Sequence, residues 1–258
     1  MRWFPLLFLT GCDRLLLAAD LIQGYGDTTV VQGLFLGADI PDQTPIPPES
    51  GIYTAACKVF LAEVDDASSI AGAPLGGVDL KFESDQGTTV HFDEDEEEEG
   101  KYLVTSLGGL DYTPGEEAIV SFESGGQAGE VRVRAPSPPE VEVPVNHTAH
   151  TDMRIQITSG DFSNIVGAAY DLDHNVFAWD NLPDDVSAAY ELNQDGVDDP
   201  VSTLVIPGDA FQRPARYVVG VGGLKLADPD DFVGVNTALS TFAAAEMSMH
   251  LVFVTAPE

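Results

Sequence analysis

Short apolar stretches alternate with turn-forming residues along most of the chain. The apolar stretches are rich in Val, Phe and Tyr, and Gly, Pro, Asp and Asn separate them. In Val131-Arg132-Val133-Arg134, an extended backbone places the valines on one face and the arginines on the other. The pattern is typical of β-strands, and one stretch, 235–245, is expected to form a short helix. The predicted strands are 29–36, 57–64, 78–83, 88–92, 101–106, 118–123, 130–134, 153–158, 165–170, 175–179, 188–192, 201–206, 216–224 and 249–254.

A proline-rich segment divides these strands into two groups. Four prolines lie between residues 136 and 144, and prolines interrupt strand pairing and favour an extended connector. Turn signals recur roughly every 8–15 residues on either side, a spacing that fits antiparallel sandwiches. We therefore predict an all-β protein with two antiparallel β-sandwich domains, at 28–135 and 150–258, joined by a linker at 136–149.

Two local resemblances support this architecture. The segment Tyr112-Thr113-Pro114-Gly115, just before the predicted strand 118–123, resembles a turn of bacterial immunoglobulin-like and carboxypeptidase-regulatory-like modules. The second half, with its proline-rich lead-in and a late strand that includes Tyr217, resembles a fibronectin type III module. The resemblances imply immunoglobulin-like sandwiches, but a fold by itself implies no activity.

The N-terminus has the plan of a secretory signal. Arg2 precedes an apolar run over residues 3–9, and small residues then lead to a cysteine. The segment Leu9-Thr10-Gly11-Cys12 resembles the lipobox of bacterial lipoproteins. That resemblance implies a signal peptide at 1–11, lipidation of Cys12, acylation of the new N-terminus (for example by palmitate) and a tether at 12–27. The alternative is a cytosolic start whose apolar residues pack into a core.

The lipobox resemblance places the protein in the bacterial cell envelope. Two or three acyl chains give stable anchoring, whereas one gives only marginal binding. Asp13, directly after the cysteine, resembles a signal for inner-membrane retention, but sorting rules differ between bacterial groups. Anchoring to the outer membrane and anchoring to the inner membrane therefore both stay open.

The net charge of the chain excludes some classes of binding partner. With 43 acidic and 11 basic residues, the chain carries a formal charge of −32. Such a surface cannot neutralise phosphates, so nucleic acid is not expected as a partner, and neither is charge-driven docking on anionic lipids. Hydrophobic residues make up 44 % of the chain, which is too many for a disordered acidic coil. The remaining partners are the membrane, through covalent lipid, and envelope proteins or polysaccharide. The acidity is explained equally well by a saline medium and by an ordinary acidic secreted protein.

One acidic segment arranges oxygen ligands as in a calcium loop. Glu191, Asn193 and Asp195 alternate, Gly196 permits a sharp turn, and Asp199 follows. Hard oxygen donors around a glycine resemble the first nine positions of such a loop, so Ca²⁺ is a possible ligand of these residues. The twelfth position is a serine and not the usual bidentate glutamate. The alternative is an acidic hairpin turn without metal, in which case the protein has no cofactor.

Other polar groups favour simpler interpretations. The seven consecutive acids at 93–99 predict a mobile, solvated loop, and the residues at 171–175 predict a polar turn. His147 and His150 are weak evidence for zinc without a third ligand. Cys57 lies in an apolar run and is expected to be a buried, inert thiol.

Enzyme motifs are missing from the sequence. It contains no Gly-x-Ser-x-Gly elbow, His-Glu-x-x-His motif, phosphate-binding loop or dinucleotide glycine fingerprint. We therefore expect a non-catalytic, lipid-anchored envelope protein that presents two sandwich modules for binding or scaffolding. One alternative is a calcium-dependent adhesion or carbohydrate-binding lipoprotein. A second alternative is an envelope hydrolase whose site is built from loops that join the modules.

Overall fold

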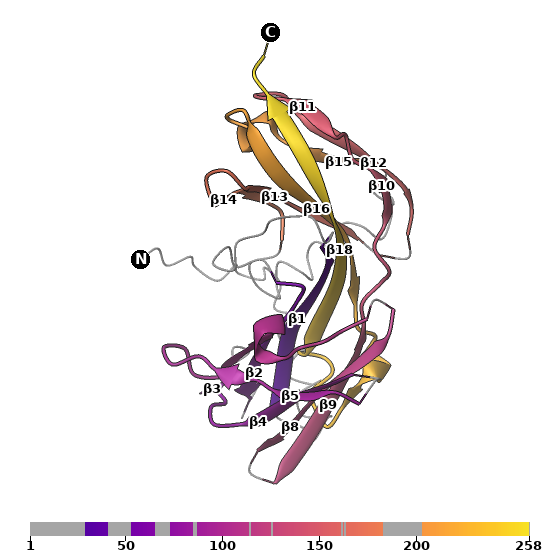
Figure 1. The fold of residues 1–258 in the computed structure, drawn as a ribbon. Coiled ribbons are helices and arrows are strands. Elements are labelled where there is room, and N and C mark those ends of the chain that lie inside the picture. The colour runs from indigo at the N-terminus through magenta and orange to yellow at the C-terminus, as the bar shows by residue number, and fades with distance from the viewer. Residues whose placement is uncertain are drawn as a thin grey trace, which may run out of the picture.

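The computed structural model describes residues 29–40, 53–64, 73–84, 87–113, 115–124, 126–160, 162, 164–182 and 203–257 (Figure 1). This part of the chain is all-β, as the sequence predicts, with strands arranged in three sheets. Short 3₁₀ turns connect some of them: η2 (Ser106–Gly108), η3 (Gly208–Ala210) and η4 (Pro229–Asp231). No helix of the described part is long and apolar enough to cross a membrane.

A ten-stranded sheet runs through the described part of the molecule. Its strands are β1 (Thr29–Asp39), β2 (Ala55–Glu63), β3 (Ala73–Pro74), β6 (Asp93–Glu94), β7 (Lys101–Thr105), β11 (Asn146–Thr148), β13 (Asn164–Asp171), β14 (Val176–Asp180), β16 (Ala215–Leu226) and β18 (Thr241–Thr255). The main order is β14-β13-β16-β18-β1-β2-β7-β6, with β11 beside β18 and β3 beside β2. Most neighbours are antiparallel, but β1 and β11 both run parallel to β18.

Two smaller sheets each cover part of this large sheet. One contains β4 (Asp79–Ser84), β5 (Thr89–His91), β8 (Glu117–Ser124), β9 (Gln127–Arg134) and β17 (Phe232–Val233). The other contains β10 (Glu140–Glu142), β12 (Met153–Ser159) and β15 (Thr203–Ile206). In Figure 1 the five-stranded sheet lies at the lower end of the molecule and the three-stranded sheet at the upper end. The result is two β-sandwiches that share one sheet.

Each small sheet encloses its own hydrophobic core. The first core packs Phe35 of β1 against Phe82 of β4, with ring centroids 5.7 Å apart. The second core packs Ile155 of β12 against residues of β16 and β18, among them Tyr217 and Val252. Burial of these apolar side chains provides the main stabilisation of both sandwiches.

The strand β18 contributes to both cores because of its period-two pattern. Alternate residues of a strand share one face. On the face that the small sheets cover, apolar residues come first, polar residues follow, and apolar residues return. The order along this face is Phe242 and Ala244 in the first core, then Glu246, Ser248 and His250, then Val252 and Val254 in the second core. We call Glu246, Ser248 and His250 the seam, because they lie between the two cores.

The predicted strands are confirmed wherever the structure describes them. Each of the thirteen predicted ranges outside 188–192 overlaps an observed strand, and 188–192 lies outside the described residues. The predicted helix at 235–245 is wrong. A turn held by Asn236, whose Oδ1 accepts from the amide of Ala238 at 3.2 Å, leads instead into β18. The alanines at 243–245 have a high helix propensity, but burial between two neighbouring strands outweighs it.

The two cores do not follow the predicted boundary in the chain. Residues of 232–244, which the sequence assigns to the second module, pack into the first core, among them Phe232 and Phe242. The range 136–149, predicted as an extended linker, contains β10 and β11, which pair with β12 and β18. Strand pairing between distant parts of the chain decides which residues enter each core. The local proline content does not predict that pairing.

The packing of Phe242 provides a test of the shared sheet. A Cβ at Gly33 of β1 would lie 2.2 Å from the ring of Phe242, so the glycine leaves the space that the ring fills. We expect Phe242→Ala to lower the free energy of unfolding by about 3–5 kcal/mol, since it empties a fully buried site. The control is Phe253→Ala on the same strand, where the side chain is 42 % exposed and the expected loss is about 1 kcal/mol or less. Urea unfolding of both variants measures the difference, and equal losses would contradict the shared core.

Candidate functional site

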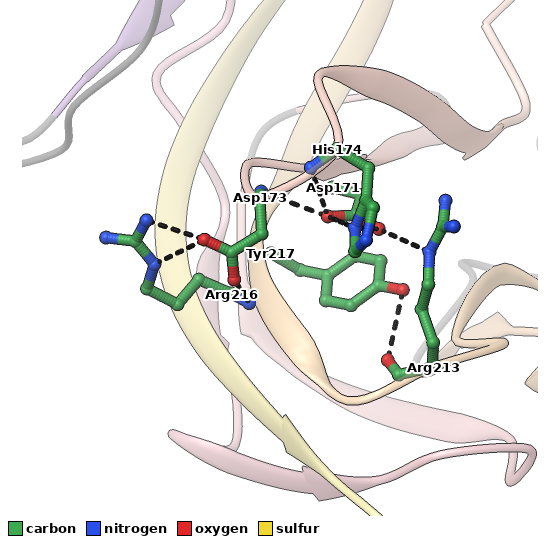
Figure 2. Close-up of polar contacts among 6 residues, drawn as sticks. All are labelled: Asp171, Asp173, His174, Arg213, Arg216 and Tyr217. Carbon is green, nitrogen blue, oxygen red and sulfur yellow. Dashed lines mark hydrogen bonds and ion pairs between the residues drawn. The ribbon is translucent and has the colours of Figure 1, made fainter.

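A buried aspartate organises the turn between β13 and β14. Asp171 is 1 % exposed, and its Oδ1 accepts the backbone amides of Asp173 at 3.0 Å and His174 at 3.1 Å. Its Oδ2 lies 2.9 Å from Nδ1 of His174 and accepts from Nε of Arg213 at 3.1 Å (Figure 2). A buried carboxylate is stable only when such partners replace its water. These contacts therefore hold the polar turn that the sequence predicts at 171–175.

A second aspartate in the same turn pairs with an arginine. The carboxylate of Asp173 accepts from the backbone amide of Arg216 at 2.8 Å, and from Nε and Nη2 of that residue at 2.9 and 2.6 Å (Figure 2). The hydrogen bonds from Arg216 hold the pKa of Asp173 below its usual value and raise the pKa of Arg216. Burial raises the pKa of the neighbouring Tyr217, whose hydroxyl donates to the carbonyl of Arg213 at 3.4 Å. The cluster is a structural one, since its charged groups are engaged with each other and with the backbone.

The acidic run at 93–99 is more ordered than the sequence predicts. Asp93 and Glu94 form β6, and Glu94 accepts from the amides of Gly77 at 2.8 Å and Gly100 at 3.1 Å. These backbone hydrogen bonds lower the pKa of Glu94. Asp95 accepts from the amide of Glu97 at 2.8 Å. The prediction of a mobile loop is wrong for this part of the run, because backbone amides offset the repulsion between neighbouring carboxylates.

The side chain of His147, near the predicted linker, has structural partners. Nε2 of His147 lies 2.8 Å from the carbonyl oxygen of Thr151, and the ring meets that of Phe211 edge to face at 4.8 Å. His150 occupies the left-handed region, with φ at 61°. Within the described ranges no group of three or more His, Cys, Asp and Glu side chains could hold a metal ion. Burial strongly raises the pKa of the Cys57 thiol, which disfavours the reactive thiolate.

The two sites that the sequence singles out lie outside the described residues. Cys12 belongs to 1–28, and the calcium ligands Glu191, Asn193, Asp195 and Asp199 belong to 183–202. Lipidation and calcium binding therefore both stay predictions.

A cleft of about 420 Å³ lies beside β9, at the start of the predicted linker. Arg132 and Arg134 line it from β9 and Lys225 lines it from β16, so three of the 11 basic residues of the chain meet here. The acidic residues of the lining are Glu117, Asp228 and Asp231.

The charges around the cleft are balanced and partly paired. Arg134 lies 3.7 Å from Glu117, and Arg132 lies 3.2 Å from Glu130 just outside the lining. Balanced charges on solvent-exposed side chains favour a polar ligand that offers both donors and acceptors, rather than a simple anion. The sequence signals only the two arginines on the exposed face of β9, because Lys225 and the acids Asp228 and Asp231 come from segments far away in the chain.

Comparisons with known proteins add little to this geometry. No protein-family model matches the chain, and no curated protein matches it. Among solved structures it is similar to chicken CNTN1 FN1–FN3 domains (10 % identity, TM-score 0.23), covering 77 % of this chain and 60 % of that one. The chain thus spans less than two thirds of that structure.

Two further similar structures are tandems of domains. A chimeric titin Z1Z2–Z1Z2 tandem has 11 % identity and a TM-score of 0.19, with coverage of 75 % of this chain and 89 % of that one. DIP-gamma IG1+IG2 has 9 % identity and a TM-score of 0.20, with coverage of 88 % and 100 %. Scores this low establish no common strand arrangement, so the all-β sandwich class rests on the sheets themselves.

Calcium binding at 191–199 can be tested directly. The calcium-loop hypothesis predicts binding in calorimetric titration with a Kd on the order of 0.1–1 mM, the range of extracellular calcium modules, whereas the metal-free hairpin predicts no heat. Asp195→Asn, which removes a ligand charge, should weaken binding at least about tenfold. Asp209→Asn, an exposed aspartate of η3, is the matched control and should leave binding unchanged. Absence of both heat and a calcium-dependent rise in Tm would rule out the site.

Proposed function

We propose that the protein is a lipid-anchored, non-catalytic component of the bacterial cell envelope that presents two sandwiches for binding or scaffolding. The observation that supports this role best is the ten-stranded sheet common to both cores. Because β18 passes from one core to the other without interruption, the two sandwiches are coupled through backbone hydrogen bonds and not through a loose linker. A body of this kind suits a protein that holds partners at a fixed spacing.

The direction of β1 supports the proposed attachment. β1 begins at Thr29, which pairs with Glu63 of β2 at one end of the first core. From there the strand runs toward the seam. A tether from Cys12 would therefore enter the end of the first sandwich that is remote from the second. The first sandwich is therefore the one that the chain enters first after the proposed tether.

The cleft beside β9 is the proposed contact surface. Its balanced charges suit the hydroxyl, amide and carboxylate groups of envelope polysaccharides or proteins. The charge of −32 disfavours nucleic acid and anionic lipid as competitors for this surface.

The anchor is tested by replacing the lipidated residue. Cys12→Ser removes the only sulfur that a lipobox would modify, so we expect the protein to move from the membrane fraction to a soluble fraction. Cys57→Ser is the matched control, because Cys57 is buried in the first core, and its product should stay with the membrane. Membrane association of the Cys12→Ser protein in high salt would refute the anchor.

The contact surface is tested by photo-crosslinking in intact cells. We expect a photoreactive residue at Ser137, which lines the cleft and is exposed, to give a covalent adduct. The same residue at Asp209, which is exposed but not part of the cleft lining, should give none. Arg134→Glu should lower the yield at Ser137 severalfold, since it places an acid where the cleft has a donor. A yield that does not depend on residue 134 would contradict binding in the cleft.

A further inference from the structure

The seam contains a buried carboxyl group with an unused acceptor. Glu246 is 2 % exposed, and its Oε2 has no hydrogen-bond partner among the described residues. Polar atoms this deeply buried are nearly always paired, and an unpaired one calls for an explanation. Glu246 lies in the middle of β18, where the strand leaves the first core and approaches the second.

The neighbouring strand leaves space for this carboxyl group. Gly37 of β1 is the register partner of Glu246. A Cβ at position 37 would lie 1.8 Å from Oε2 of Glu246, so no residue other than glycine fits without moving the carboxyl group. β1 and β18 are therefore packed around this side chain at the point where they join the two cores.

After burial, the charge that acts on Glu246 is that of another acid. On β1 the closest acid is Asp39, two residues beyond Gly37 on the same face. Tyr112 approaches from the segment before β8, but its hydroxyl donates to the carbonyl of Glu116 at 2.9 Å and accepts from the amide of Ala135 at 3.0 Å.

The remaining neighbours lie on the two strands of the sheet. On β16 the register partner of Glu246 is Gly223, and the next residue on that face is Lys225, which lines the cleft. On β18 itself the neighbours on this face are Ser248 and His250, whose pKa burial lowers. Burial first, and the negative charge of Asp39 second, raise the pKa of Glu246 to about 8.

We propose that Glu246 is a proton-dependent switch that controls how tightly the two sandwiches are coupled. With its proton, the side chain is neutral and the pairing of Gly37–Asp39 with Glu246–Ser248 is kept. Without the proton, a negative charge is buried beside Asp39. The response that costs the least free energy is separation of β1 from β18 at the seam, because water can then solvate the charge.

The direction of the pH effect follows from linkage. The pKa of Glu246 is higher in the folded state than its usual value of 4.5, so the folded protein keeps this proton over a pH range in which the unfolded chain has lost it. The stabilisation is complete below about pH 4.5 and is lost as the pH rises through about 8. Between pH 6 and pH 9 the folding equilibrium constant should fall on the order of a hundredfold from this group alone.

Chemical unfolding at pH 6 and pH 9 tests the switch. Glu246→Gln keeps the shape of the side chain but cannot ionise. Between the two pH values we therefore expect the folding equilibrium constant of the wild type to fall on the order of a hundredfold more than that of Glu246→Gln. Glu140→Gln on β10 is the matched control, because it removes an exposed acid of the same type, and it should behave as the wild type does. Equal pH dependence in the wild type and Glu246→Gln would overturn the proposal.

Two measurements on the unaltered protein complete the test. Carboxyl carbon NMR should show Glu246 titrating near pH 8, and a value close to 4.5 would overturn the proposal. Hydrogen exchange, corrected for the intrinsic effect of pH, should increase at residues 37–39 and 246–248 above pH 8 more than within β8 and β9. Uniform behaviour of these segments would equally count against a switch at the seam.

Discussion

The alternation of side chains along β18 is the constraint on which the rest of the structure depends. Fifteen residues in one strand bury apolar groups in the first core, pass through the seam and bury apolar groups again in the second core. Because β1 and β16 both pair with this strand, neither core can form completely without it. The chain therefore builds one continuous sheet with two covers, and the coupling of the sandwiches is a property of the backbone. That coupling is the structural basis of the scaffolding role proposed for the protein.

The acidic surface is organised more closely than its net charge suggests. Asp171 is buried against an arginine, a histidine and two backbone amides, whereas Glu94 is held mainly by the backbone amides of Gly77 and Gly100. In both places hydrogen bonds compensate a carboxylate that would otherwise repel its neighbours. Glu246 is the contrasting case, because burial and a second acid act on it in the same direction and raise its pKa to about 8. A salt-screened surface and an uncompensated interior acid thus respond to different variables, ionic strength for the first and pH for the second.

The strands could be predicted from the sequence because each depends on its own alternation. Val131 and Val133 face the first core while Arg132 and Arg134 face outward, as their order in the chain implies. The turn at 171–175 was also predictable, since aspartate and asparagine favour turns. The helix at 235–245 was predicted wrongly because alanines carry a helix signal that burial in the sheet overrides. The cleft beside β9 could not be predicted beyond its two arginines, because Glu117, Lys225 and Asp228 reach it from separate strands and loops.

The amino-acid sequence by itself determined the all-β class and the positions of most of the longer strands in the described part of the chain. These properties depend on local periodicity and on composition, which need no knowledge of distant contacts. Only the tertiary structure decided that residues 232–244 complete the first core, that β1 runs parallel to β18, and that Glu246 lies buried beside Gly37. Each of these depends on which distant strands pair and in what register. Alternation specifies the face on which a side chain lies, but it does not specify which strand becomes its neighbour.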